Sequence, residues 1–318
     1  MKQPNFLIIG ERRSGTTTLA NWIKIHPEIY LHPQMDIGYF IDDDLVGSRE
    51  YKEGKVDQSL WGENHDQETY NSLFDDSTSD HKAIGEKSAD YLFLPQCHAR
   101  IMSFNSDMKL LIVLRNPVDR AWSMYWNEFA KGRISKPFKE HIKEEKKLID
   151  KSDYALDHLS FVERGKYDVS ITKLFNTFNS EQVKIVILEE LLNKPKEVLS
   201  EVYDFLEVDT HLGYENMNKK FNQNWVLLKK HAVKENALYS KFDDLYYFIV
   251  RKFFKIINFK NKRKRRDNII KWMTMTRLSK KDLKIDKALR SELIRIYKPH
   301  ILNLETIIQK DLKKWLAE

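Results

Sequence analysis

The chain has 318 residues, of which 42% are hydrophobic, and a formal net charge of +7. This length is enough for one large α/β domain with a buried core, and the basic charge favours an anionic partner such as nucleotide phosphates, a glycan, a membrane surface or nucleic acid. The single cysteine, Cys97, excludes an intramolecular disulfide and indicates a reducing compartment. Only four consecutive apolar residues follow Asn5, too few for a signal sequence or a membrane span, so we expect a cytoplasmic protein.

Strand and helix patterns alternate along the chain. Three apolar runs, each followed by polar residues and a helical pattern, predict buried parallel strands at 6–9, 110–114 and 183–188. The predicted helices cover 16–25, 117–131, 166–178, 195–206 and 286–316. We therefore expect an α/β fold with a P-loop-containing parallel sheet flanked by helices, in a single domain over 1–318. Ligands of such sheets bind beyond the carboxyl ends of the strands, so Arg13, Arg115 and Glu189 should share one edge.

The loop after the first predicted strand has the glycine spacing of a phosphate-binding loop. Gly10 and Gly15 are separated by four residues, as in a Walker A loop, where backbone N–H groups at the start of a helix bind an anion. Thr16 stands where the usual loop lysine would be, and the basic charge lies earlier, on Arg12 and Arg13. The loop therefore suits a doubly phosphorylated nucleotide whose terminal group is not a γ-phosphate.

A second anion site is predicted after the strand at 110–114. This strand ends in Arg115, where a Walker B strand would end in a magnesium-binding aspartate. Arginine binds a phosphate through two parallel N–H bonds, and Ser123, two turns into the following helix, adds a hydroxyl. An isolated arginine at a strand end would instead be an ion-pair partner. The histidines form no His-Glu-x-x-His motif and no Cys/His cluster, so we expect no metal site.

Two segments depart from the α/β pattern. Residues 41–82 are acidic, polar and weakly periodic, which predicts a loop-rich insertion on the binding face. Residues 222–275 form a second insertion, with apolar residues at helical spacing over 236–259 and a basic run at 260–266. This insertion is either a packed helix followed by a solvated basic loop, or a lid over a hydrophobic acceptor site, or a surface that docks on anionic lipid or glycan.

These motifs together resemble the PAPS-dependent sulfotransferase superfamily, in its bacterial and heparan-sulfate-type branch. PAPS is 3′-phosphoadenosine 5′-phosphosulfate. The family's 5′-phosphosulfate loop resembles residues 13–17, and its 3′-phosphate motif resembles 115–123. Further stretches that agree are 85–92, 164–167, 183–206 and 311–315. The likeness covers residues 4–208 and 286–316, and it leaves most of both insertions without a family guide.

The resemblance implies transfer of a sulfuryl group from PAPS to an acceptor hydroxyl, giving a sulfate ester and PAP without a metal. The residues it places on PAPS are Arg12, Arg13, Ser14, Gly15, Thr16, Thr17, Thr18, Arg115 and Ser123. Arg115 and Ser123 take the 3′-phosphate, and the loop from Gly15 to Thr18 takes the 5′-phosphate. Arg13 replaces the family's usual lysine, and its role is electrostatic because arginine is a very poor proton donor.

The resemblance also suggests residues on the acceptor side. Residues 35–40 resemble the family's Lys-Glu-x-x-Phe-Phe segment, so Asp36 falls at the position of the general base and Met35 replaces the lysine. His32 is the alternative base, because imidazole titrates near neutral pH. Lys87 resembles a family lysine near the transferring group or the acceptor.

The acceptor and two rival functions stay open at this point. The acceptor is either a carbohydrate or a lipid, sterol or phenolic alcohol. One rival function is a P-loop small-molecule kinase in which Glu189 helps to hold a metal. The other is a non-catalytic protein that binds anions or membranes, with residues 251–266 in contact with an anionic surface. Nucleic acid is not expected as a partner, because no recognisable binding motif accompanies the basic run.

Overall fold

The computed structural model describes residues 2–41, 67–130, 133–134, 136–152, 156, 158–215, 226–229, 275–278 and 284–317. The chain divides into two compact units. The first comprises Met1–Met124, Lys139–Gln223 and Ile285–Glu318, and the second comprises Tyr125–Phe138 and Asn224–Lys284. The predicted phosphate loop and both predicted anion-binding motifs belong to the first unit.

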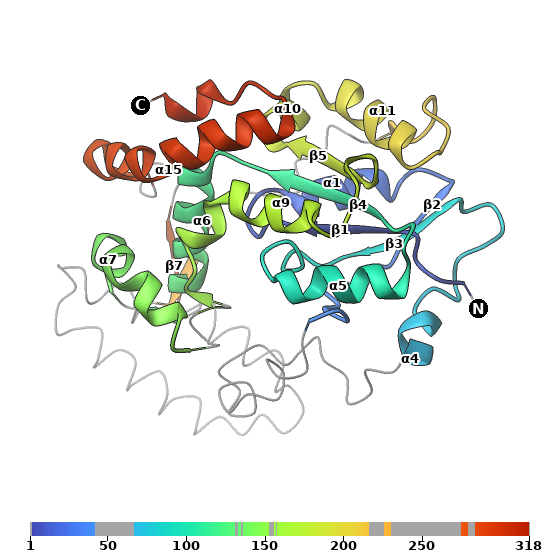
Figure 1. Cartoon of the computed structure of the whole chain (residues 1–318), viewed down its shortest axis with the longest axis horizontal. Coiled ribbons are helices and arrows are strands. Elements are labelled where there is room, and N and C mark those ends of the chain that lie inside the picture. Colours follow the sequence, from blue (N-terminus) through green and yellow to red (C-terminus); the bar gives the residue numbers. More distant parts are fainter. Residues whose placement is uncertain are drawn as a thin grey trace, which may run out of the picture. The chain divides into compact units, whose positions relative to one another are not determined.

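A parallel sheet of five strands forms the centre of the first unit (Figure 1). Its order is β2-β3-β1-β4-β5, and every neighbouring pair is parallel. The strands are β1 (Phe6–Gly10), β2 (Ile29–Leu31), β3 (Ala83–Lys87), β4 (Lys109–Leu114) and β5 (Val183–Ile187). β1 is buried along its whole length, because strands of a doubly covered parallel sheet are enclosed on both faces.

Helices cover both faces of this sheet (Figure 1). The helices within the described residues are α1 (Thr16–Ile23), α4 (Gln67–Ser72), α5 (Pro95–Phe104), α6 (Pro117–Ala130), α7 (Phe138–Ile149), α9 (Tyr167–Phe175), α10 (Leu188–Asn193), α11 (Pro195–Phe205) and α15 (Lys287–Ile308), with 3-10 turns η1 (Glu163–Gly165), η2 (Ser180–Gln182) and η3 (Lys313–Leu316). One core layer joins α1 and α11 to alternate strand residues, among them Phe6 and Ile8. Since side chains alternate along a strand, Leu7 and Ile9 lie on the opposite face.

The three predicted strands are confirmed as β1, β4 and β5, and four of the predicted helices are confirmed as α1, α6, α9 and α11. Strands β2 and β3 were not predicted. β2 has only three residues, and β3 contains a glycine and two charged residues, so neither has a recognisable apolar run. The region 41–82, predicted as loop-rich, includes the short helix α4.

The predicted helix at 286–316 was too long. α15 ends at Ile308 because Gln309 adopts the left-handed conformation, with φ of 55°, and the chain re-enters a helical turn only at η3. Left-handed residues commonly end helices, although glycine or asparagine is the usual choice. The start of α15 follows the expected chemistry, since the Asp286 side chain accepts a hydrogen bond from the Leu289 N–H.

In the second unit, β6 (Val226–Lys229) pairs antiparallel with β7 (Met275–Leu278). The predicted amphipathic helix at 236–259 and the basic run at 260–266 lie outside the described residues. Most of the predicted insertion at 41–82 does so as well. Whether the chain forms a single domain therefore stays a prediction. Among the described helices, none has the length and apolarity that a membrane crossing requires.

Candidate functional site

The phosphate loop joins the end of β1 to the start of α1. Gly15 caps α1 in the left-handed conformation, with φ of 97°, and its carbonyl accepts hydrogen bonds from the N–H groups of Thr18 and Leu19. The φ of 97° is strained for any residue with a side chain, and a Cβ at Gly15 would also lie 2.4 Å from Leu188 Cδ1, so glycine is strongly favoured here. Because the first N–H groups of a helix have no partner within the helix, this end of α1 attracts an anion.

Two arginines and a serine meet beside this loop. Arg13 Nε donates to Ser123 Oγ over 3.2 Å, and Arg115 Nη1 donates to the Arg13 carbonyl over 3.3 Å. The next residue, Asn116, donates its N–H to Glu189 Oε1 over 3.0 Å. These contacts place Arg13, Arg115 and Glu189 along one edge of the sheet, as the alternation of strands and helices predicted.

This donor set fits the phosphates of a nucleotide such as PAPS. Among the described residues, no carboxylate pairs with the guanidinium of Arg115, which donates to the backbone carbonyl of Arg13. Thr17 is exposed at the first turn of α1, and Arg13 is exposed as well. Guanidinium groups, hydroxyls and helix N–H groups are all donors, and an anion with several oxygen acceptors satisfies them together.

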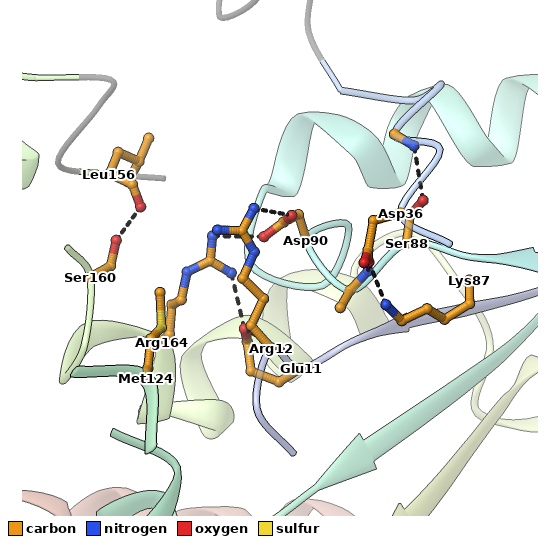
Figure 2. A network of polar contacts seen from close by, with 12 residues as sticks. Glu11, Arg12, Asp36, Lys87, Ser88, Asp90, Met124, Leu156, Ser160 and Arg164 are labelled. Atoms are coloured by element: carbon orange, nitrogen blue, oxygen red, sulfur yellow. Dashed lines mark hydrogen bonds and ion pairs between the residues drawn. The ribbon is translucent and has the colours of Figure 1, made fainter. Parts of the chain in front are cut away.

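A buried group of charges lies behind the phosphate loop (Figure 2). Arg164 is only 1% exposed, and its guanidinium pairs with Glu11 and with Asp90, each over 2.9 Å. Arg12 pairs with the other carboxylate oxygen of Asp90 over 2.5 Å. The guanidinium of Arg164 also lies over the ring of Phe93 at 4.2 Å. The ion pairs tie the residues at the start of the phosphate loop to the segment that follows β3.

Burial and charge act in opposite directions on the two acids of this group. Burial raises the pKa of Glu11 above its ordinary value, although Arg164 and Arg120 oppose the rise. Burial also acts to raise the pKa of Asp90, but Arg12 and Arg164 together hold it below its ordinary value. Arg12 was expected to bind PAPS, and in this structure its guanidinium contacts Asp90. Its predicted role on the nucleotide stays a prediction.

On the acceptor side, Asp36 and Lys87 form an ion pair (Figure 2). Lys87 Nζ lies 2.5 Å from Asp36 Oδ1, which also accepts the Ala89 N–H over 3.2 Å. The Lys87 side chain is buried, whereas that of Asp36 is 40% exposed. Lys87 is the last residue of β3 and stands beside Ile8 of β1, so the pair lies one strand away from the phosphate loop.

His32 lies in a different environment. Its Nδ1 accepts the Gln34 N–H over 3.2 Å, its ring lies edge-on to Phe74 at 6.1 Å, and burial lowers its pKa. Among the described contacts, none joins His32 to Asp36 or Lys87. Of the three residues predicted on the acceptor side, the structure thus brings Asp36 and Lys87 together and leaves His32 apart from them.

Three residues of the site had no role predicted from the sequence: Glu11, Glu86 and Arg164. Each lay within a stretch that the family resemblance included, but charged residues are usually on the surface, and nothing in the pattern indicated their burial. Glu86 is fully buried, accepts a hydrogen bond from Ser88 Oγ over 2.8 Å, and has its pKa raised to about 7 by burial. The one signal in the sequence that could have indicated the burial of Glu86 is its place in a short strand, next to residues that are themselves buried.

Comparisons with known proteins agree with this geometry. The family model described as sulfotransferase domain matches residues 3–244. The bifunctional heparan sulfate N-deacetylase/N-sulfotransferase 1 of Caenorhabditis briggsae is 25% identical over 231 residues, which are 66% of this chain and 24% of the relative. The heparan sulfate glucosamine 3-O-sulfotransferase 5 of Homo sapiens is 27% identical over 215 residues, which are 67% of this chain and 56% of the relative. The chain thus spans less than two thirds of the length of either relative.

A solved structure gives the same fold. The crystal structure of a sulfotransferase from Alicyclobacillus acidocaldarius matches with a TM-score of 0.70 and 24% sequence identity, and the match covers 100% of both chains.

The raised pKa of Glu86 predicts a distinctive pH dependence of stability. Between its ordinary value of 4.5 and about 7, the folded protein binds more protons than the unfolded chain, so the contribution of Glu86 to stability falls as the pH rises. Glutamine does not titrate. The free energy of unfolding of the Glu86→Gln variant, relative to that of the wild type, should therefore rise by about 3 kcal/mol from about pH 5 to about pH 8. The size follows from the pKa shift, since one pKa unit corresponds to about 1.4 kcal/mol.

Urea unfolding of both proteins at the two pH values measures this gain. The control is Glu28→Gln. A hydrogen bond from Lys82 lowers the pKa of Glu28 below its ordinary value, so Glu28 is ionised in both the folded and the unfolded protein across this pH range, and its variant should show a nearly constant difference from the wild type. An unchanged difference between wild type and Glu86→Gln across the pH range would show that Glu86 titrates normally.

Proposed function

This chain belongs to the sulfotransferase domain family, and from that membership we propose that it transfers a sulfuryl group from PAPS to an acceptor hydroxyl. The observation that carries the proposal is the group formed by Arg13, Arg115 and Ser123 at the N-terminal end of α1. The ion-paired Asp36 and Lys87 stand one strand away. One edge of the sheet thus carries both anion-binding donors and a candidate base.

On the nucleotide side, PAPS supplies an activated sulfuryl group, and the protein binds its 5′-phosphate and its 3′-phosphate. In the proposal, the N–H groups from Gly15 to Thr18 hold the 5′-phosphate, with the hydroxyls of Thr16 and Thr17. Arg115 and Ser123 hold the 3′-phosphate. Arg13 lies between these two sets and stabilises the negative charge that develops as the bond to sulfur breaks.

On the acceptor side, Asp36 takes the proton of the acceptor hydroxyl. Its carboxylate is partly exposed, which leaves it accessible, and the Ala89 N–H holds one of its oxygens. Lys87 brings a cation to the same place, where it stabilises charge on the transferring group. Both residues are held by backbone at the end of β3, so the base approaches the acceptor from a defined direction.

We propose an anionic carbohydrate as the acceptor. Two relatives are named for heparan sulfate, and the net charge of +7 suits an anionic glycan. A lipid, sterol or phenolic acceptor was suggested by residues 236–259, which lie outside the described residues. The family match gives the kinase alternative no support, and Glu189 accepts the Asn116 N–H.

Two further predictions from the sequence stay predictions. One is contact between residues 251–266 and an anionic surface, since these residues lie outside the described ones. The other is a cytoplasmic location, which was expected because the apolar run after Asn5 is too short for a signal sequence or a membrane span.

A screen with labelled PAPS tests the acceptor class. Label should pass to oligosaccharides that contain uronic acids, and at a much lower rate to neutral oligosaccharides, a sterol or a phenol. Preferential labelling of the sterol or the phenol would contradict the carbohydrate proposal but leave sulfuryl transfer intact. No transfer to any acceptor, with no binding of PAP, would contradict the proposed function itself.

Calorimetry with PAP tests the nucleotide side. Arg115→Ala should weaken PAP binding by about 2 to 3 kcal/mol, because charge-assisted hydrogen bonds to the 3′-phosphate are lost. The wild type should bind PAP without magnesium. A fitting control is Arg290→Ala, which removes a partly exposed arginine that pairs with Asp119. Equal PAP affinity in wild type and Arg115→Ala would remove Arg115 from the site.

Steady-state kinetics identify the base. Asp36→Asn should lower turnover by about 10² to 10⁴ while PAP affinity is preserved, because amide oxygen cannot take up the acceptor proton. His32→Ala should keep most of its turnover. The reverse result, with an active Asp36→Asn and an inactive His32→Ala, would assign the base to His32.

A further inference from the structure

We infer that Glu86 is a positioning residue that orients Ser88 and so anchors the loop at 36–41, which carries Asp36. The inference depends on the proposed function only for the role of Asp36 as base. It concerns a residue that touches neither nucleotide nor acceptor in the proposal, and it acts through hydrogen bonds that the structure shows.

The connection runs from Glu86 through Ser88 to the loop. The hydroxyl of Ser88 donates a hydrogen bond to Glu86 Oε2 over 2.8 Å and accepts one from the Gly38 N–H over 2.9 Å. A serine hydroxyl has one proton and two lone pairs. Because the hydroxyl proton points to Glu86, the lone pairs of Ser88 Oγ face the Gly38 N–H and can accept its hydrogen bond. Figure 2 shows Ser88 at the end of β3, beside the ion pair of Asp36 and Lys87.

A second contact holds the same loop two residues further on. The Phe40 N–H donates to the hydroxyl of Tyr91 over 3.4 Å, and the two rings lie edge to face at 5.5 Å. Burial and the charge of Glu86 raise the pKa of Tyr91 well above its ordinary value, so its hydroxyl stays protonated. Two residues that follow β3, Ser88 and Tyr91, therefore hold the loop from Gly38 to Phe40.

The loop needs such anchors because its backbone is strained. The strain is at Asp36, which has φ of 58°, because a left-handed aspartate is less favourable than an extended one, whereas Gly38 adopts its φ of 75° at no cost. The Asp36 N–H donates to the Lys87 carbonyl over 2.6 Å, which fixes one side of the turn. The bond from Gly38 to Ser88 fixes the other. Without it, the turn keeps the contact of the Asp36 N–H but loses the backbone contact on the other side of Asp36, and the carboxylate is held only through Lys87 and the Ala89 N–H.

The cost of burying Glu86 also favours a specific role. Its side chain is fully buried, and the hydroxyls of Ser88 and Tyr91 act as its side-chain hydrogen-bond partners against the effect of burial. A buried carboxylate that is held by neutral hydroxyls is costly, and an apolar residue of similar size would be cheaper for stability alone. The carboxylate is therefore better explained by the hydroxyl that it orients than by the packing of β3.

Kinetics of four variants test the inference. Glu86→Leu and Ser88→Ala should each lower kcat by about 10- to 100-fold, the size of effect that a displaced catalytic group gives. Glu86→Gln retains an acceptor oxygen for Ser88 and should lose less. PAP affinity should stay that of the wild type in all three, because the nucleotide donors lie on other residues. The control is Asp168→Asn, a buried carboxylate whose partners, His300 and Asn303, lie on α15.

The decisive comparison uses variants that already lack the base. In an Asp36→Asn background, Glu86→Leu and Ser88→Ala should cause no further loss of turnover, because they act through Asp36. A general structural effect would lower the residual turnover by the same factor as in the wild type, and that result would overturn the inference.

Amide hydrogen exchange separates this inference from the proposed function. In Glu86→Leu and Ser88→Ala, the Gly38 and Phe40 amides should exchange at least about tenfold faster than in the wild type, with other core amides unchanged. This measurement needs no substrate, so it decides the anchoring role even if the wild type transfers no sulfuryl group. Unchanged exchange of the loop amides would overturn the inference whatever the activity.

Discussion

The arrangement of the site depends on one buried arginine. Arg164 comes from the 3-10 turn before α9, and its guanidinium joins Glu11, at the start of the phosphate loop, to Asp90, just after β3. Removing one partner of such buried pairs leaves an uncompensated charge and commonly costs about 3 to 5 kcal/mol. The same contact ties together the two segments that hold the nucleotide donors and the acceptor-side residues.

Strand order then decides which residues share the edge of the sheet. β1 lies between β3 and β4, so the phosphate loop has Lys87 on one side and Arg115 on the other. The cations of the site therefore come from three adjacent strand ends, as is usual for ligand sites of parallel sheets. Two buried acids of the site, Glu11 and Asp90, are paired with Arg164 and Arg12, whereas Asp36 pairs with Lys87 and stays partly exposed.

The carboxylates of the site differ in how far motifs predicted them. Asp36 was identified through its place after the first helix, and the structure pairs it with Lys87, another predicted residue. Glu86 precedes Lys87 in the same strand and received no role, although it is fully buried. Both residues are buried, but neighbouring residues of a strand point to opposite faces, so they meet different partners, and their spacing in sequence does not reveal which partners these are.

The sequence alone determined the phosphate loop, three strands of the sheet, the helices that follow them and the two arginines at the edge. These features depend on local patterns: glycine spacing, apolar runs and residues at strand ends. Tertiary structure alone decided the short strands β2 and β3, the left-handed end of α15, and the partners of Arg12, Glu86 and Arg164. The physical reason is that a buried charge is stabilised by partners far along the chain, here 153 residues apart for Arg164 and Glu11.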